Sequence, residues 1–137
     1  MKATTALASA LVLAATAAVS DETTLRYMMW DPDQLEIEAD TIAEFEAANP
    51  GVTVETQAMP PSDYWPKLSA MAAAGDLPDV FAMSSGFVKG WARAGNLADL
   101  SEVTADTDLS VYYEGALIPG MVDGQMVAFP QNWVAPV

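Results

Sequence analysis

The 137-residue sequence contains no cysteine and no histidine. It therefore has no thiol nucleophile, no histidine-assisted catalytic triad and no ordinary zinc site, and we expect neither a bound metal nor a cofactor. Basic residues are also scarce, with 5 Lys and Arg against 19 Asp and Glu, for a formal net charge of −14. Because a chain this acidic is repelled by phosphate backbones and by anionic membrane surfaces, we expect no nucleic-acid partner.

The sequence also lacks a long hydrophobic run. The apolar stretch within residues 1–20 is too short and too rich in alanine to span a membrane. Lys2 gives this segment a positive start, and small residues at its end offer A-x-A-like cleavage sites. We interpret residues 1–20 as a signal peptide, with a buried N-terminal helix or an uncleaved anchor as alternatives. Since no cysteine is available for a lipid anchor, the mature protein should diffuse freely in the periplasm, without membrane insertion.

Strand-like and helix-like segments alternate along the rest of the chain. Residues 24–30 are nearly all apolar, as expected of a central strand covered on both faces, whereas residues 52–58 alternate like a strand near a sheet edge. Helices are predicted between the cap Asp31 and Asn49, and between the cap Ser62 and Gly75, with Pro66 in the first turn of the second helix. This order predicts an α/β fold with a mainly parallel sheet flanked by helices. Further strands are predicted over 78–83 and 125–129, and a further helix over 87–94.

The residues that follow each predicted strand are candidates for a binding site, because open parallel sheets bind ligands beyond the carboxyl ends of their strands. Sugars are recognised by aromatic faces, which cover their C–H patches, and by amides and carboxylates, which bind their hydroxyl groups. Residues of these types stand at three strand ends and at the start of one helix. We predict a ligand-binding site formed by Trp30, Asp31, Tyr64, Trp65, Ser84, Ser85, Gln131, Asn132 and Trp133.

Packing and capping roles compete with ligand binding for several of these residues. Tyr64 lies on the inner stripe of its helix, which favours a core position, whereas Trp65 is one position off that stripe. Asp31 stands where a helix cap is expected. Ser84 and Ser85 can equally cap the helix that follows them.

No group of residues forms a recognisable catalytic constellation. Carboxylates are abundant, but most fall on helix faces or in loops, and no pair stands out as a general acid and base. The pairs Asp31/Asp33 and Asp106/Asp108 lack the further ligands that a calcium loop needs at fixed spacing, so we interpret them as solvated acids. We therefore predict that the protein is not an enzyme.

A series of sequence blocks resembles the family 1 extracellular solute-binding proteins, the maltose-binding-protein-like group. The blocks are LRYMMW, IAEFEAANPGVTVE, YWPKLSAMAAAGDLPDVFAMSSGF, WARAGNLADLS and GQMVAFPQNW, and they run from Thr24 to Trp133. Each block alone is a common α/β pattern, but their order and spacing together are specific. The most specific pieces are AAGDLPDVF and the block from FEAANPG to VTVE.

The resemblance implies a two-lobed binding protein that closes around its ligand by a hinge. Residues 21–137 would be its first lobe, a truncated periplasmic-binding-protein-like lobe, with the second lobe absent from this chain. The implied function is capture of a small solute, a mono- or oligosaccharide, by a monomeric periplasmic protein that delivers it to the membrane subunits of an ABC permease. Two alternatives stay open, a secreted carbohydrate-active enzyme and a docking module without a ligand of its own.

Overall fold

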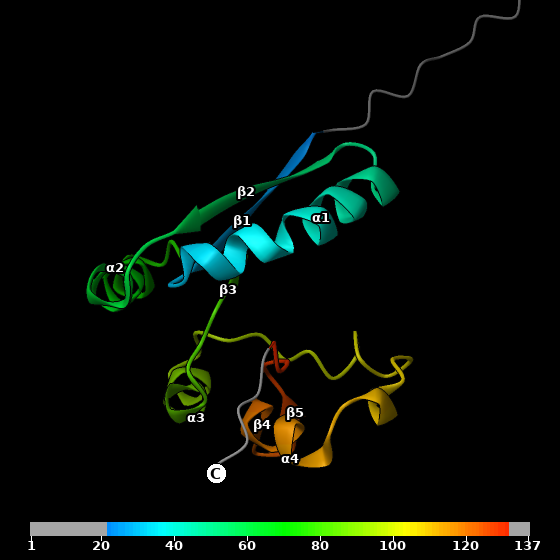
Figure 1. The fold of residues 1–137 in the computed structure, drawn as a ribbon. Helices are drawn as coiled ribbons and strands as arrows, with labels where there is room; N and C mark the ends of the chain where they lie inside the picture. Colours follow the sequence, from blue (N-terminus) through cyan, green and yellow to red (C-terminus); the bar gives the residue numbers. More distant parts are fainter. Residues whose placement is uncertain (1–21, 132–137) are drawn as a thin grey trace, which may run out of the picture.

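A computed structural model describes residues 22–131 of the chain. Its centre is a three-stranded parallel sheet with the order β2-β1-β3 (Figure 1). The strand β1, Thr23–Met29, pairs along its whole length with β2, Val52–Ala58, and over two residues with β3, Val80–Phe81. The predicted α/β architecture, a parallel sheet flanked by helices, is confirmed.

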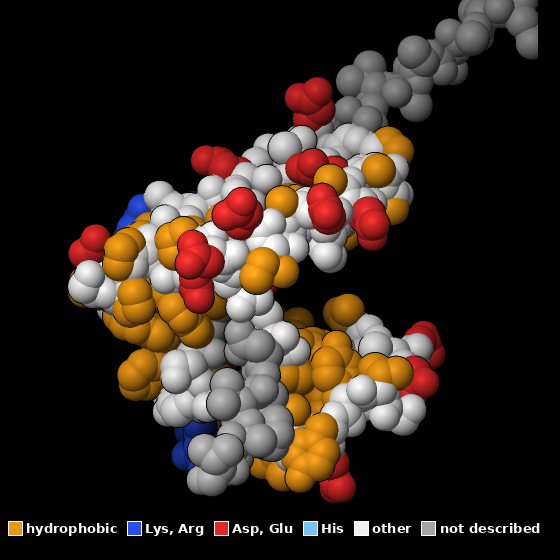
Figure 2. All heavy atoms as spheres, in the orientation of Figure 1, with side chains coloured by type: hydrophobic (Ala, Val, Ile, Leu, Met, Phe, Trp, Pro, Cys, Tyr) orange, Lys and Arg blue, Asp and Glu red, His pale blue; other side chains and the backbone are white. Residues whose placement is uncertain are grey.

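The helix α1, Pro32–Ala48, connects β1 to β2. Asp31 caps it, since Asp31 Oδ1 accepts hydrogen bonds from the backbone N–H groups of Asp33 and Gln34 at 3.1 and 3.3 Å. The apolar stripe of α1 faces β2 only loosely, and an open groove between them is lined in part by Ile42 and Val54. Acidic side chains gather on the outer surface over α1 (Figure 2).

The helix α2, Pro61–Ala74, connects β2 to β3 and ends at Gly75, which adopts the left-handed conformation with φ of 69°. The predicted cap Ser62 is wrong, because the helix begins at Pro61, whose fixed φ suits the first helical position. Ser62 Oγ instead donates to the carboxylate of Asp63 at 3.4 Å. Pro66 consequently lies inside α2 rather than in its first turn, where its missing N–H removes one helical hydrogen bond.

The strand β3 is much shorter than the predicted 78–83, and Val80 is 53% exposed, so the prediction of a buried strand there is wrong. Side-chain contacts replace part of the backbone pairing. The backbone N–H of Arg26 donates to the carboxylate of Asp79 at 2.8 Å, and the Arg26 guanidinium donates to Asp76 and to the carbonyl of Leu77. These contacts hold the segment before β3 against β1 without the backbone hydrogen bonds of a β-sheet.

The sheet, α1 and α2 form one body, which we call the sheet body. Its core consists of Met28, Tyr64 and Leu68, which are at most 2% exposed. Tyr64 comes from the predicted inner stripe of α2, Leu68 lies four residues later in the same helix, and Met28 comes from the central strand. Half-buried side chains complete this core: Trp30, Met59, Trp65, Met71, Leu77, Phe81, Met83 and Trp91.

A second body, the hairpin body, follows β3 and lies below the sheet body in Figure 1. The strands β4, Met121–Val122, and β5, Gln125–Met126, pair in an antiparallel hairpin, so the predicted strand over 125–129 is shorter than expected and does not join the main sheet. The turn residues Asp123 and Gly124 both have positive φ, which suits a tight two-residue hairpin. The other elements are α3, Ser85–Arg93, α4, Glu114–Leu117, and the short 3₁₀ helices Leu109–Val111 and Ile118–Gly120.

The helix α3 links the two bodies through its side chains. Trp91 packs against the core of the sheet body, with its ring 6.0 Å from that of Phe81. Val88 is buried against Val122 and Val127 in the hairpin body. The α3 helix therefore sets the position of the hairpin body relative to the carboxyl ends of the strands.

Candidate functional site

Three aromatic side chains meet at the carboxyl end of the sheet. Trp30 directly follows β1, Trp65 lies in α2, and Phe87 lies in the first turn of α3. The ring of Trp65 is 5.2 Å from that of Trp30 and 5.1 Å from that of Phe87. We call these three residues the aromatic strip; Figure 2 shows apolar side chains gathered between α2 and α3.

Tyr64 supports the aromatic strip from within the core. Its ring is fully buried and makes edge contacts with Trp30 and Trp65, at 5.5 and 5.0 Å. Its hydroxyl donates to the carbonyl of Ala82 at 2.6 Å and lies 3.3 Å from the carbonyl of Met28, so it joins β1 to the segment after β3. Burial raises the pKa of the Tyr64 hydroxyl. The structure therefore gives Tyr64 a structural role beside the predicted site.

Asp31 follows Trp30 and caps α1 with one of its carboxylate oxygens, Oδ1. Among the described residues, no hydrogen bond is formed by the other oxygen, Oδ2. The side chain is exposed, so this oxygen can accept a hydrogen bond from a bound molecule. Capping and ligand binding are therefore compatible at this position.

Ser84 and Ser85 lie at the start of α3, on the segment that leads from β3 to Phe87. Ser84 is the N-cap of α3, but its hydroxyl makes no capping hydrogen bond to the helix. Its carbonyl accepts a hydrogen bond from the backbone N–H of Phe87 at 2.8 Å. Both serines thus lie within three residues of the aromatic strip along the chain.

Gln131 is held by contacts away from the aromatic strip. Its side-chain amide donates to the hydroxyl of Tyr27 at 2.8 Å and also contacts the carboxylate of Glu38. Tyr27 in turn donates to Glu38 at 2.8 Å, and burial and this carboxylate raise the pKa of the Tyr27 hydroxyl. Since side chains alternate across a strand, Tyr27 and Met28 face opposite sides of the sheet, with Tyr27 toward α1. The other two predicted residues of this segment, Asn132 and Trp133, lie outside the described residues.

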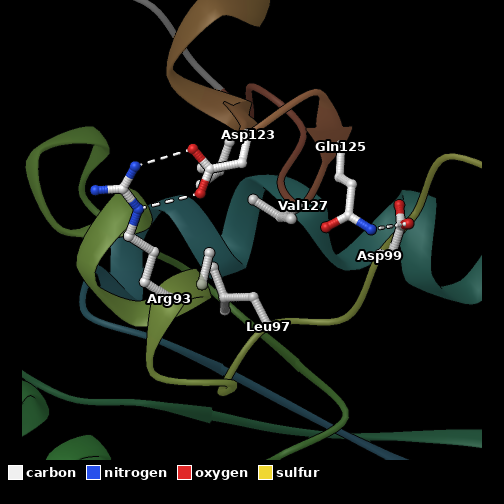
Figure 3. A pocket seen from close by; sticks show the side chains of 8 residues that line it. Arg93, Leu97, Asp99, Asp123, Gln125 and Val127 are labelled. Atoms are coloured by element: carbon white, nitrogen blue, oxygen red, sulfur yellow. Dashed lines mark hydrogen bonds and ion pairs between the residues drawn. The ribbon is translucent and has the colours of Figure 1, made fainter.

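A small cavity of about 90 Å³ lies between α3 and the β4–β5 hairpin (Figure 3). Its polar side chains bind one another: Arg93 donates to Asp123 at 2.9 and 3.1 Å, and Gln125 donates to Asp99 at 2.6 Å. The Arg93 guanidinium lowers the pKa of the Asp123 carboxyl. These polar groups already have partners. We therefore interpret the cavity as part of the packing between α3 and the hairpin, and not as a binding site.

Phe87 is the member of the aromatic strip that our sequence reasoning missed. The sequence analysis places it only at the start of the helix predicted over 87–94, although it stands three residues after Ser84 and is an aromatic side chain near a strand end. In the structure, the buried position of α3 belongs to the next residue, Val88. Adjacent residues of a helix point in different directions, so Phe87 does not share the contact of Val88 with the hairpin body. Its ring contacts Trp65 instead.

No group of three or more metal-binding side chains occurs within residues 22–131. In the same part of the chain, no helix is long and apolar enough to cross a membrane.

Comparison with known proteins gives a consistent result. The family described as bacterial extracellular solute-binding protein matches residues 40–137. Among solved structures, an ABC substrate-binding protein from Listeria monocytogenes in complex with cycloalternan is 30% identical, with a TM-score of 0.69 over 77% of this chain and 28% of that one. The sugar-binding protein MalE from Xanthomonas citri is 28% identical, with a TM-score of 0.71 over 79% of this chain and 28% of that one.

A third similar structure is the family 1 extracellular solute-binding protein from Alicyclobacillus acidocaldarius. It is 26% identical, with a TM-score of 0.68 over 78% of this chain and 27% of that one. The chain thus spans less than a third of the length of each of these three structures.

Proposed function

This chain belongs to the bacterial extracellular solute-binding proteins, and we propose that it forms the first lobe of a substrate-binding subunit of an ABC importer. Residues 21–137 contribute one wall of the cleft, and a second lobe, joined by a hinge, contributes the other. The solute is a mono- or oligosaccharide. The similarity to a sugar-binding protein and to a protein in complex with cycloalternan supports this class of solute.

The aromatic strip is the observation that carries this proposal. Three rings at the carboxyl ends of parallel strands occupy the position where open α/β sheets bind ligands. Aromatic faces bind the C–H patches of sugars, and the free carboxylate oxygen of Asp31 can accept a hydrogen bond from a sugar hydroxyl. Of the nine residues predicted from sequence, Trp30, Asp31, Trp65, Ser84 and Ser85 remain our proposed contacts on this wall, and Asn132 and Trp133 are further candidates.

The remaining parts of the proposal follow from the role of such a subunit. The protein is exported by a signal peptide over residues 1–20, acts as a monomer in the periplasm, and docks onto the membrane subunits of the permease. It needs no cofactor, because binding and release of the solute are its whole activity. The strong negative charge agrees with a protein that has no nucleic-acid partner.

A calorimetric screen of the full-length protein against sugars, polyols and oligosaccharides tests the proposal. We expect saturable binding of at least one carbohydrate, with the carbohydrate recovered unchanged after prolonged incubation. Formation of a hydrolysed product would instead indicate a carbohydrate-active enzyme. No binding to any member of the screen, by a protein shown to be folded, would favour a docking module without a ligand.

A further inference from the structure

The turn of the β4–β5 hairpin joins an aspartate to a glycine at the surface. Asp123 and Gly124 are both exposed, and both have positive φ, of 52° and 90°. Glycine has no side chain to shield its backbone nitrogen, so in an Asp-Gly pair this nitrogen can approach the carboxyl carbon of the aspartate. We propose that Asp123 is a site of spontaneous isoaspartate formation, and that Arg93 controls the rate of this modification by holding the Asp123 carboxylate.

The modification consumes only water and returns it. The backbone nitrogen of Gly124 loses its proton and attacks Cγ of Asp123. A C–N bond forms, a C–O bond of the carboxyl group breaks, and a water molecule leaves. Water then opens the cyclic succinimide at either of its two carbonyls, which restores aspartate or gives isoaspartate, with the main chain running through the former side chain. The mass of the protein is unchanged, and no oxidant or reductant is needed.

The backbone nitrogen of Gly124 is open to this reaction. A methyl group at Gly124 would meet no atom within 4 Å, so the space beside this residue is free. Within residues 22–131, the Gly124 N–H forms no hydrogen bond, because Gly124 lies in the turn between the paired residues of β4 and β5. No hydrogen bond of the attacking nitrogen therefore has to break first.

Arg93, in the last turn of α3, restrains the other reacting group (Figure 3). Its Nη2 and Nε donate to the two carboxylate oxygens of Asp123, at 2.9 and 3.1 Å. These bonds direct the carboxylate toward α3. The hydrogen bonds and the charge of Arg93 also lower the pKa of the Asp123 carboxyl. Because the neutral acid cyclises far more readily than its anion, a smaller neutral fraction slows the reaction.

The restraint is reversible, because the ion pair lies at the surface. The side chains of Arg93 and Asp123 are 55% and 62% exposed, so water and salt weaken their attraction. Lys89, one turn earlier on α3, lowers the pKa of the Asp123 carboxyl as well, but it ranks below Arg93 among the causes. The ion pair thus slows isoaspartate formation without abolishing it.

Isoaspartate disrupts the turn in which it forms. It adds a methylene group to the main chain and replaces the side-chain carboxylate with one attached directly to Cα, so both the two-residue turn and the contact with Arg93 are lost. The preceding residue, Val122, packs against Val88 of α3. The modification therefore loosens the hairpin body where it contacts α3.

The test follows isoaspartate in the folded full-length protein during prolonged warm incubation near neutral pH. Peptide mapping with electron-transfer fragmentation distinguishes the two isomers of equal mass. We expect isoaspartate to accumulate at Asp123, and Arg93→Ala to accelerate its formation by about two- to fivefold, as expected for loss of an exposed ion pair. Lys67→Ala is the matched control, since it removes one positive charge that binds Gln57 instead, and it should leave the rate unchanged.

Salt tests the ion pair without a substitution. Sodium chloride at about 1 M, where the Debye length is about 3 Å, should accelerate the reaction in the original protein and hardly affect Arg93→Ala. Where Arg93→Ala does not fold, Arg93→Gln and the effect of salt on the original protein give the answer.

No isoaspartate at Asp123 in any of these proteins would overturn the proposal. Equal rates in the original protein and the Arg93 variant, or a rate in the original protein that salt does not change, would overturn the control by Arg93. None of these measurements involves a sugar, so their failure leaves the proposed function intact.

Discussion

The hydroxyl of Tyr64 is the contact whose removal gives the clearest energetic prediction. It is buried, and it donates to the carbonyl of Ala82 at 2.6 Å. The other nearby acceptor, the carbonyl of Met28, also receives the backbone N–H of Ala82 at 2.9 Å and stays satisfied without the hydroxyl. In Tyr64→Phe, the carbonyl of Ala82 therefore loses the hydroxyl hydrogen bond. We expect the free energy of unfolding to fall by about 1–3 kcal/mol, the usual cost of an unpaired buried acceptor.

Urea-induced unfolding, followed by tryptophan fluorescence, measures this change. The midpoint should fall in Tyr64→Phe while the dependence on urea concentration stays the same, because the surface exposed on unfolding hardly changes. Tyr112→Phe is the matched control, because it also removes one tyrosine hydroxyl. The ring, whose centroid lies 6.0 Å from that of Phe129, is kept in this variant. The reasoning is refuted if Tyr64→Phe is as stable as the original protein within about 0.5 kcal/mol, the usual range for surface substitutions.

Four further predictions concern the caps of α1 and α2, a glycine inside α3 and the half-buried phenol of Tyr27. Asp31→Ala should lower the free energy of unfolding by about 0.5–2 kcal/mol, whereas Asp31→Asn, which can still cap α1, should be nearly neutral in the same urea titration. Gly75→Ala should destabilise by about 1–2 kcal/mol, because Gly75 has φ of 69° and the added methyl group meets no atom within 4 Å, so the cost is conformational. Gly90→Ala, inside α3 and equally free of clashes, should instead stabilise by about 0.5–1 kcal/mol. Burial raises the pKa of Tyr27 above its ordinary 10.0, so its contribution to stability is complete below pH 10.0 and is lost as the pH rises through the folded-state pKa. The absorbance difference between the original protein and Tyr27→Phe should therefore show no ionisation of this phenol near pH 10.0 while the protein stays folded.

The parts of the fold that were predictable from sequence depend on local signals. The Asp31-Pro32 pair marks the start of α1, Gly75 marks the end of α2, and the alternation in residues 52–58 marks an edge strand. Each of these signals acts within a few residues, through a cap, a positive φ or the two-residue period of a strand. The structure confirms all three.

The wrong predictions depend on contacts between residues far apart in the sequence. The length of β3 is limited because Asp79 and Asp76 bind Arg26, about fifty residues earlier, in place of a longer ladder. The last strand leaves the main sheet because its partner is the preceding segment, Met121–Val122. The Asp123-Gly124 pair is typical of a two-residue hairpin turn, but the sequence analysis predicts a strand only after this pair and none before it.

The candidate site was partly predictable for the same reason. The expectation that Trp30 and Trp65 come together follows from the parallel order of the strands, and the ring contact of 5.2 Å agrees with it. The role of Phe87 depends on how α3 turns over the end of the sheet, which no local pattern gives. The contacts of Gln131 with Tyr27 and Glu38 join residues about a hundred positions apart. No local sequence pattern predicts them either.

The most direct test of the central claim compares two tryptophans in calorimetric titrations of the full-length protein with its preferred sugar. Trp65 belongs to the aromatic strip, whereas Trp91, also half-buried, packs against Phe81 in the interior. If the strip is a wall of the solute cleft, Trp65→Leu should weaken sugar binding by about thirtyfold, as expected for an aromatic anchor, and Trp91→Leu should leave it within about threefold. Equal losses in the two variants, or no loss in Trp65→Leu, would contradict the account.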